Sequence, residues 1–206
     1  YKELISSSFV VNTPMAKVES NNFNFEHSFS YHPQINKMRK QDLHKKMLNR
    51  VPARTQDRAD LVIPSALIVA DHFRLDPFYL VSVIWTESDF KSSAKSHKGA
   101  MGFMQIMPET KAFLKKSISQ KDYSELNFKM KKFNLTSGEK ENLILGAFYL
   151  KQLKNKYKDP RLAAIAYNMG PGWVDDQRKN MAPVGLNNQY LNKVKSRYWK
   201  LSGLNR

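Results

Sequence analysis

Residues 77–89 read PFYLVSVIWTESD, a stretch that is apolar on nearly every side until it reaches Glu87. Pro77 suits the first turn of a helix, because its φ is already helical and the N–H that it lacks would have no partner there. A helix that is apolar all round must be enclosed by other elements. The stretch therefore predicts a buried helix from Pro77 to Asp89, with Glu87 where the apolar pattern ends.

Other segments carry apolar residues at steps of three and four, the period of a helix with one buried face. We expect helices from Asp57 onward, from Pro108 to Leu114, from Glu139 to Tyr157, from Leu162 to Tyr167 and from Asn188 to Trp199. Pro64 marks either a kink or the true start of the first of these. No segment alternates with the period of a strand long enough to predict one, so the expected fold class is all-α.

Three segments lack a helical period. Lys91 to Met107 is rich in Ser, Gly and Met and predicts a long structured loop, whereas Lys115 to Gly138 is polar, lysine-rich and expected to be irregular. Residues 1–33, rich in Ser, Asn and Phe, predict an extended arm, and a basic helix is expected within Ile35 to Arg54. We expect residues 1–55 to pack as an arm and basic helix on a main domain of residues 56–206.

The charge balance of the 206-residue chain is strongly basic, with 34 Lys and Arg against 18 Asp and Glu and a net charge of +16. Such a charge predicts a polyanionic partner without identifying it. The aromatic residues lie mostly at core-like positions rather than among the basic ones, so no nucleic acid is expected. The chain has no Cys, which excludes disulfides and a thiol nucleophile. No stretch approaches the roughly 18 apolar residues of a membrane span.

Glu87 is the candidate catalytic residue. Partial burial would raise the pKa of its carboxyl, and the negative end of a helix disfavours its ionised form as well. A carboxyl that stays protonated near neutral pH is what the cleavage of a glycosidic bond requires of its general acid. The alternative is an ordinary helix-end glutamate that faces water, which for Glu87 taken alone is the commoner situation.

Two later segments favour the catalytic interpretation. The loop from Gly99 to Pro108 combines small residues with Met104, Gln105 and Met107, a mixture of close backbone approach, an amide and apolar walls that suits a sugar. Residues 166–172 read AYNMGPG and supply a Tyr hydroxyl and an Asn amide at a helix end. A structural interpretation is also open, with the Met residues as core filler and the Gly-Pro-Gly sequence as a turn.

Together these segments resemble the lytic transglycosylases of the soluble Slt type, over roughly Leu61 to Trp199. The resemblance rests on Glu87-Ser88 followed by Ser96-x-x-Gly-Ala-x-Gly-x-Met-Gln, on Asn142 with residues 146–150 (GAFYL), and on the AYNMGPG segment. It implies a goose-lysozyme-like helical domain that acts on peptidoglycan in the periplasm or outside the cell. It further implies that Glu87 protonates the bond between N-acetylmuramic acid and N-acetylglucosamine, then takes a proton from the muramic C6 hydroxyl to give a 1,6-anhydro end.

The same resemblance assigns the remaining site residues. Sugar subsites are expected at Ser96, Gln105, Met107, Ala166, Tyr167 and Asn168, and a hydrogen bond from Tyr167 would hold Glu87 or the departing oxygen. The reaction implied needs neither a metal nor a cofactor, and Asp89, two residues from Glu87, should point elsewhere. The chain departs from the family pattern at Phe103, at Met169 and at Leu186-Asn187, where a Glu-Thr pair is usual. Its Lys111 to Lys140 segment is also longer than expected between the first two motifs, as a lid or a specificity insertion would be.

Two alternatives stay open. A lysozyme-type muramidase would use water in place of the C6 hydroxyl, and a non-catalytic cell-wall or nucleic-acid binding module would use the charge alone. The expected partners are peptidoglycan glycan strands, and the expected oligomeric state is a monomer.

Overall fold

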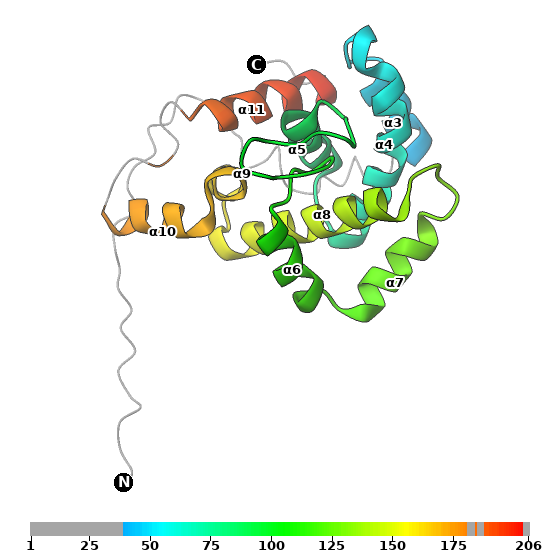
Figure 1. Cartoon of the computed structure of the whole chain (residues 1–206). Helices are drawn as coiled ribbons and strands as arrows, with labels where there is room; N and C mark the ends of the chain where they lie inside the picture. The colour runs from blue at the N-terminus through cyan, green and yellow to red at the C-terminus, as the bar shows by residue number, and fades with distance from the viewer. Residues whose placement is uncertain (1–38, 181–183, 185–187, 204–206) are drawn as a thin grey trace.

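The computed structural model describes residues 39–180, 184 and 188–203, so the arm expected from residues 1–33 lies outside the described residues. Within these residues the chain forms nine α-helices and no strand, which confirms the all-α fold class (Figure 1). The helices are α3 (Lys40–Leu48), α4 (Ala53–Phe73), α5 (Pro77–Ser88), α6 (Pro108–Ser117), α7 (Gln120–Lys129), α8 (Ser137–Tyr157), α9 (Pro160–Met169), α10 (Pro171–Lys179) and α11 (Gln189–Ser202).

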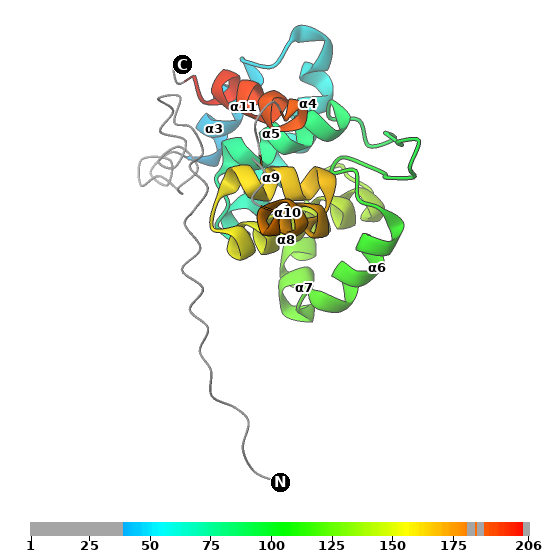
Figure 2. The same ribbon diagram turned by 90° about the vertical axis from the view of Figure 1, so that its left-hand side faces the viewer.

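Helix α5 lies at the centre of the packing, as its sequence predicts. Every residue from Pro77 to Trp85 is buried. Asp76 starts the helix, because its carboxylate accepts a hydrogen bond from the Tyr79 N–H at 3.0 Å. α5 packs mainly against α11 and also against α4, and the two views in Figures 1 and 2 both place α11 beside it. The end of α5 that carries Glu87 is thereby set against the helix that carries Tyr190.

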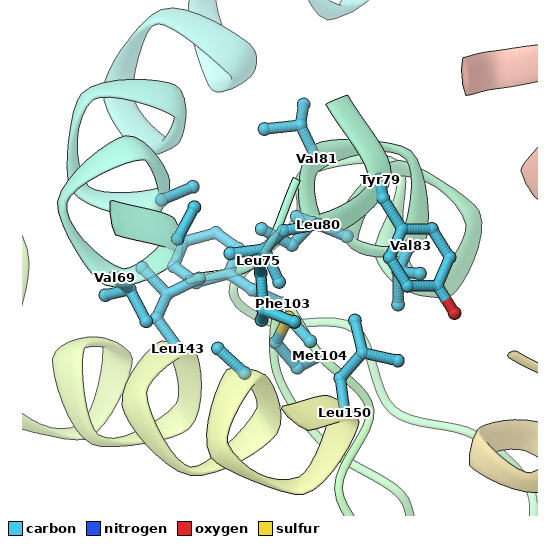
Figure 3. Packing of buried hydrophobic residues seen from close by; sticks show 14 of the residues in the cluster. Val69, Leu75, Tyr79, Leu80, Val81, Val83, Phe103, Met104, Leu143 and Leu150 are labelled. Carbon is cyan, nitrogen blue, oxygen red and sulfur yellow. The ribbon is translucent and has the colours of Figure 1, made fainter. Parts of the chain in front are cut away.

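The core also takes in the loop that follows α5. Phe103 and Met104 are 1% and 0% exposed, although they belong to a segment without regular structure. Figure 3 shows them among Leu75, Leu143 and Leu150, so the loop is anchored by its own apolar side chains in the space between α5 and α8. Of the residues that follow, Ile106 is buried as well, whereas Gln105 and Met107 are half-buried.

The structure corrects three expectations about the helices. Lys115 to Gly138 is not irregular throughout, because α7 occupies its middle; Ser119 caps α7 by accepting a hydrogen bond from the Asp122 N–H at 3.0 Å. The Gly-Pro-Gly sequence ends α9 but also begins α10, since Pro171 serves as the first residue of a new helix. α4 runs through Pro64 from Ala53, so Pro64 is not the start of that helix.

The basic segment before residue 55 contributes α3, whose Leu43 and Met47 are buried. α3 packs against α4 and, less extensively, against α11. The division of the chain at residue 55 stays a prediction. Among the described helices none is both long and apolar enough to cross a bilayer.

Candidate active site

Glu87 lies in the last turn of α5 and is only partly exposed. Its Oε1 accepts a hydrogen bond from the Tyr190 hydroxyl of α11 at 2.6 Å. Burial raises the pKa of Glu87 to about 7, against smaller lowering effects of the Tyr190 hydrogen bond and of the positive charge on Arg197. The direction of this pKa shift is the one expected from the sequence. Near neutral pH the carboxyl can therefore both donate and accept a proton.

Asp89 has hydrogen-bond partners that differ from the one of Glu87. Its two carboxylate oxygens accept hydrogen bonds from the Trp85 indole N–H at 3.0 Å and from the Arg58 guanidinium at 2.9 Å. Asp89 follows the last residue of α5, and the positive charge of Arg197 on α11 acts on both Asp89 and Glu87. Asp89 is thus bound in an ion pair and is not a second carboxylate for Glu87.

The loop residues Ser96 and Gln105 shape the loop itself. The Ser96 hydroxyl accepts a hydrogen bond from the Ala100 N–H at 3.0 Å. The Gln105 side-chain nitrogen donates to the carbonyl oxygens of Ala94 and Gly102 at 2.8 and 2.9 Å. Only the side-chain oxygen of Gln105 is thus left to accept a bond from a sugar hydroxyl. Met107 is half-buried where the loop enters α6.

The third predicted segment contributes less directly than expected. The Tyr167 hydroxyl donates to the Met104 carbonyl oxygen at 2.8 Å, so of the two expected partners of Tyr167 the bond to Glu87 is wrong. The bond to the departing oxygen stays a prediction. Tyr167 still lies close enough for the charge of Glu87 to raise its pKa, after the larger effect of burial. Ala166 is 0% exposed, which gives its methyl group no direct contact with a substrate, whereas Asn168 is exposed.

Tyr190 is the site residue that the sequence did not identify. It stands at helical spacing with Leu191, Val194 and Tyr198, a pattern that is typical of the core face of a helix. A buried Tyr hydroxyl needs a hydrogen-bond partner, and this was the available signal. That partner could be found only from the packing of α11 against α5. The neighbouring departure at Leu186-Asn187 lies outside the described residues.

A second α11 residue, Arg197, completes the surroundings of Glu87. Its guanidinium lies 5.2 Å from the centre of the Trp85 ring, and its Nη1 atom is buried without a hydrogen-bond partner in the described part of the chain. No group of three or more His, Asp or Glu residues in the described ranges has the arrangement of a metal site. A surface pocket of about 490 Å³ lies elsewhere, next to α3, α4 and the end of α7, and includes none of these residues.

Comparisons with known proteins extend this picture. The model of the transglycosylase SLT domain family matches residues 66–189, more than half of the chain. Proteins named membrane-bound lytic murein transglycosylase C are similar: that of Histophilus somni (strain 2336) is 30% identical over 144 residues, 63% of this chain and 36% of the relative. That of Haemophilus influenzae (strain PittEE) is 29% identical over 150 residues, 66% of this chain and 40% of the relative.

A solved structure agrees in fold. The lytic transglycosylase Slt from Pseudomonas aeruginosa, crystallised as an inactive mutant with glutamate replaced by glutamine, aligns with a TM-score of 0.52 and 25% identity. The alignment covers 70% of this chain and 25% of that one. This chain therefore spans well under half of the relatives it matches. From the extent of the family match, the chain belongs to the transglycosylase SLT domain family.

Proposed function

We propose that this chain is a peptidoglycan lytic transglycosylase, which cleaves the bond between N-acetylmuramic acid and N-acetylglucosamine and leaves 1,6-anhydro ends. The observation that carries the proposal is the state of Glu87. Its pKa is raised to about 7 by burial, and a Tyr190 hydroxyl fixes one of its oxygens at 2.6 Å. A carboxyl with a pKa near the working pH is suited to act first as an acid and then as a base.

The reaction uses Glu87 twice. In the first step its proton passes to the glycosidic oxygen as the bond to the muramic C1 atom breaks, and the substrate's own acetamido group stabilises the cationic centre. In the second step the Glu87 carboxylate takes the proton of the muramic C6 hydroxyl while that oxygen closes on C1. Glu87 ends protonated again, and no second carboxylate is needed, in keeping with the ion pair that binds Asp89.

The other residues have supporting roles. Tyr190 holds Glu87 in one rotamer, and its hydrogen bond favours the carboxylate that forms after the first step. The oxygen of Gln105, the hydroxyl of Ser96 and the side chain of Met107 line the sugar subsites, together with Asn168 at the end of α9. Tyr167 acts on the substrate indirectly, through the Met104 carbonyl that it holds.

The charge of the chain suits a wall polymer as substrate. Muramic peptides and attached acidic polymers make the wall anionic, and a net charge of +16 would attract the enzyme to it. This attraction should weaken as salt is added. A substrate in the wall places the protein in the cell envelope, in the periplasm or outside the cell, and the relatives named as murein transglycosylases support this location.

The mass of the products tests the proposal. Purified sacculi incubated with the protein should release muropeptides that are lighter by one water than the corresponding hydrolysis products. Hydrated products alone would assign the chain to the lysozyme-type muramidases instead. Binding to sacculi without the release of any fragment would assign it to the non-catalytic wall-binding modules.

A further inference from the structure

One side chain of α8 spans the turn at the centre of the 91–107 loop. The Asn142 amide nitrogen donates to the Met101 carbonyl oxygen at 2.9 Å, and its oxygen accepts from the Met104 N–H at 2.8 Å. A single amide therefore closes both ends of residues 101–104. Backbone groups held in this way cannot move independently of α8.

The backbone of residues 101–104 lies so close to α8 that side chains at two glycine positions would clash. Gly102 has a φ of 82°, and a Cβ atom there would lie 2.6 to 2.8 Å from the Asn142 amide. One turn further along α8, a Cβ on Gly146 would lie 2.5 Å from the Cβ of Met104. Both positions need glycine because the turn lies directly against the helix. The amide thus acts on a backbone that is already in close contact with it.

The turn of residues 101–104 also contacts residues of the candidate site. The Met104 carbonyl accepts the Tyr167 hydroxyl, and the next residue is Gln105, whose side chain folds back on Gly102. Met104 itself points into the core, as Figure 3 shows. Displacement of the turn would therefore displace Gln105 and the entry to α6 together.

The neighbouring residue on α8 holds the helix that follows the loop. Glu141 is 9% exposed, and its two oxygens form ion pairs with Lys111 and Lys115 of α6. Adjacent residues of α8 thus anchor the loop and α6, on either side of Met107. Contacts with α8 therefore fix the position of both ends of the stretch from Met101 to Lys115.

We propose that Asn142 is a positioning residue, which holds residues 101–107 in the shape that lets Gln105 and Met107 meet the sugar beside Glu87. This inference rests on the proposed function. Asn142 does not touch the reacting atoms; it acts through the turn. The amide suits this position at every pH, because its nitrogen donates and its oxygen accepts without titrating, as Met101 and Met104 demand.

The substitution Asn142→Asp provides a sharp test. An ionised carboxylate still accepts from the Met104 N–H but cannot donate to the Met101 carbonyl, which it would instead repel. A protonated carboxyl can do both, so acid should restore the native pattern. Ionisable groups near position 142 include Lys140 and Glu141 of α8, Lys111 and Lys115 of α6, the Tyr167 hydroxyl of α9 and Lys95, which pairs with Met101, whereas residues 99–107 carry none.

The measurement is kcat/KM on a soluble peptidoglycan fragment, as the ratio of Asn142→Asp to wild type at each pH, which removes the titration of Glu87. We expect a deficit of about 10- to 100-fold at pH 8, of the size caused by small misplacements in active sites. The deficit should shrink as the pH falls to 5. A ratio near one throughout, or a deficit independent of pH, would overturn the proposal.

Thr136→Ala serves as the control for a general loss of stability. Thr136 caps the start of the same helix α8 and is exposed. Its loss should lower the melting temperature while leaving kcat/KM at the wild-type value. If Thr136→Ala and Asn142→Asp lose activity in proportion to their melting temperatures, Asn142 has only a structural role.

Amide hydrogen exchange separates this proposal from the proposed function. The N–H of Met104 should exchange faster in Asn142→Leu than in wild type, without any substrate present. If wild type releases no product from peptidoglycan, the proposed function fails, and exchange alone decides whether Asn142 holds the turn. Unchanged exchange at Met104 in Asn142→Leu would refute that role.

Discussion

Helix α5 has a carboxyl at each end, the buried Asp76 at its start and the partly exposed Glu87 in its last turn. Burial raises the pKa of both to about 7, and each accepts a hydrogen bond from a tyrosine of α11. Tyr198 donates to Asp76 at 3.1 Å, and Tyr190 donates to Glu87 at 2.6 Å. By pKa and partner alone the two carboxyls could not be told apart.

They differ in their access to solvent and in their backbone surroundings. Asp76 is 0% exposed and binds the Tyr79 N–H at the positive end of the helix, where a carboxylate completes the first turn. Glu87 is partly exposed at the negative end, where the 91–107 loop begins. A raised carboxyl pKa therefore reports burial, and only access to a site makes the carboxyl a candidate catalyst.

The largest expected effect is on activity. Glu87→Gln should lower the rate of muropeptide release from sacculi by about 10²- to 10⁴-fold, because the amide cannot transfer a proton. Asp76→Asn should stay active, since the amide resembles the protonated acid that burial already favours and still caps α5. Circular dichroism would check that both variants fold. An active Glu87→Gln variant would make the assignment of the catalytic residue wrong.

The second effect is on stability, and here we expect the larger loss at Asp76 rather than at Glu87. Asp76→Ala should lower the free energy of unfolding by about 3 kcal/mol, because it removes a helix cap and leaves the buried Tyr198 hydroxyl without this acceptor. Urea denaturation measures this loss. Ser119→Ala, which removes the exposed cap of α7, should cost only about 1 kcal/mol. Equal losses in the two variants would show that the burial of Asp76 contributes nothing.

The third effect concerns the pH dependence of stability, to which the two carboxyls contribute in the same direction because burial raises the pKa of both. Between about pH 4.5 and 7 the folded state binds a proton at Glu87 that the unfolded state has lost, so wild-type stability falls as the pH rises through this window. Glu87→Gln lacks this contribution. Relative to wild type, it should therefore gain about 3 kcal/mol of stability between pH 4.5 and 8. Denaturation at several pH values tests this, and a parallel pH dependence would contradict the raised pKa.

The smallest effect separates the two tyrosines. Tyr190→Phe removes a hydrogen bond that lowers the pKa of Glu87, so that pKa should rise further. The alkaline limb of the rate profile, where Glu87 loses its proton, should then move up by about one pH unit. Tyr198→Phe should leave the limb in place. A pH–rate profile that moves equally in both variants would indicate a general disturbance of α11.

Much of the fold followed from local pattern. The apolar run from Pro77 predicted the buried helix α5, and the period of three and four predicted α8 and α11 within a few residues. α7 was missed because only Leu126 on it is buried. This helix also makes polar contacts with α4, such as the one between His72 and Asp122 at 2.8 Å. Such contacts leave no periodic trace in a sequence.

For the candidate site, the sequence by itself determined Glu87 at the end of a buried helix, the direction of its pKa shift and the small-residue loop beside it. These depend on neighbours along the chain. Only the tertiary structure decided that Tyr190, rather than Tyr167, binds Glu87, and that Asn142 holds the loop. These partners are 103, 63 and 38 residues apart in sequence, so they meet only after α5, α8, α9 and α11 have packed.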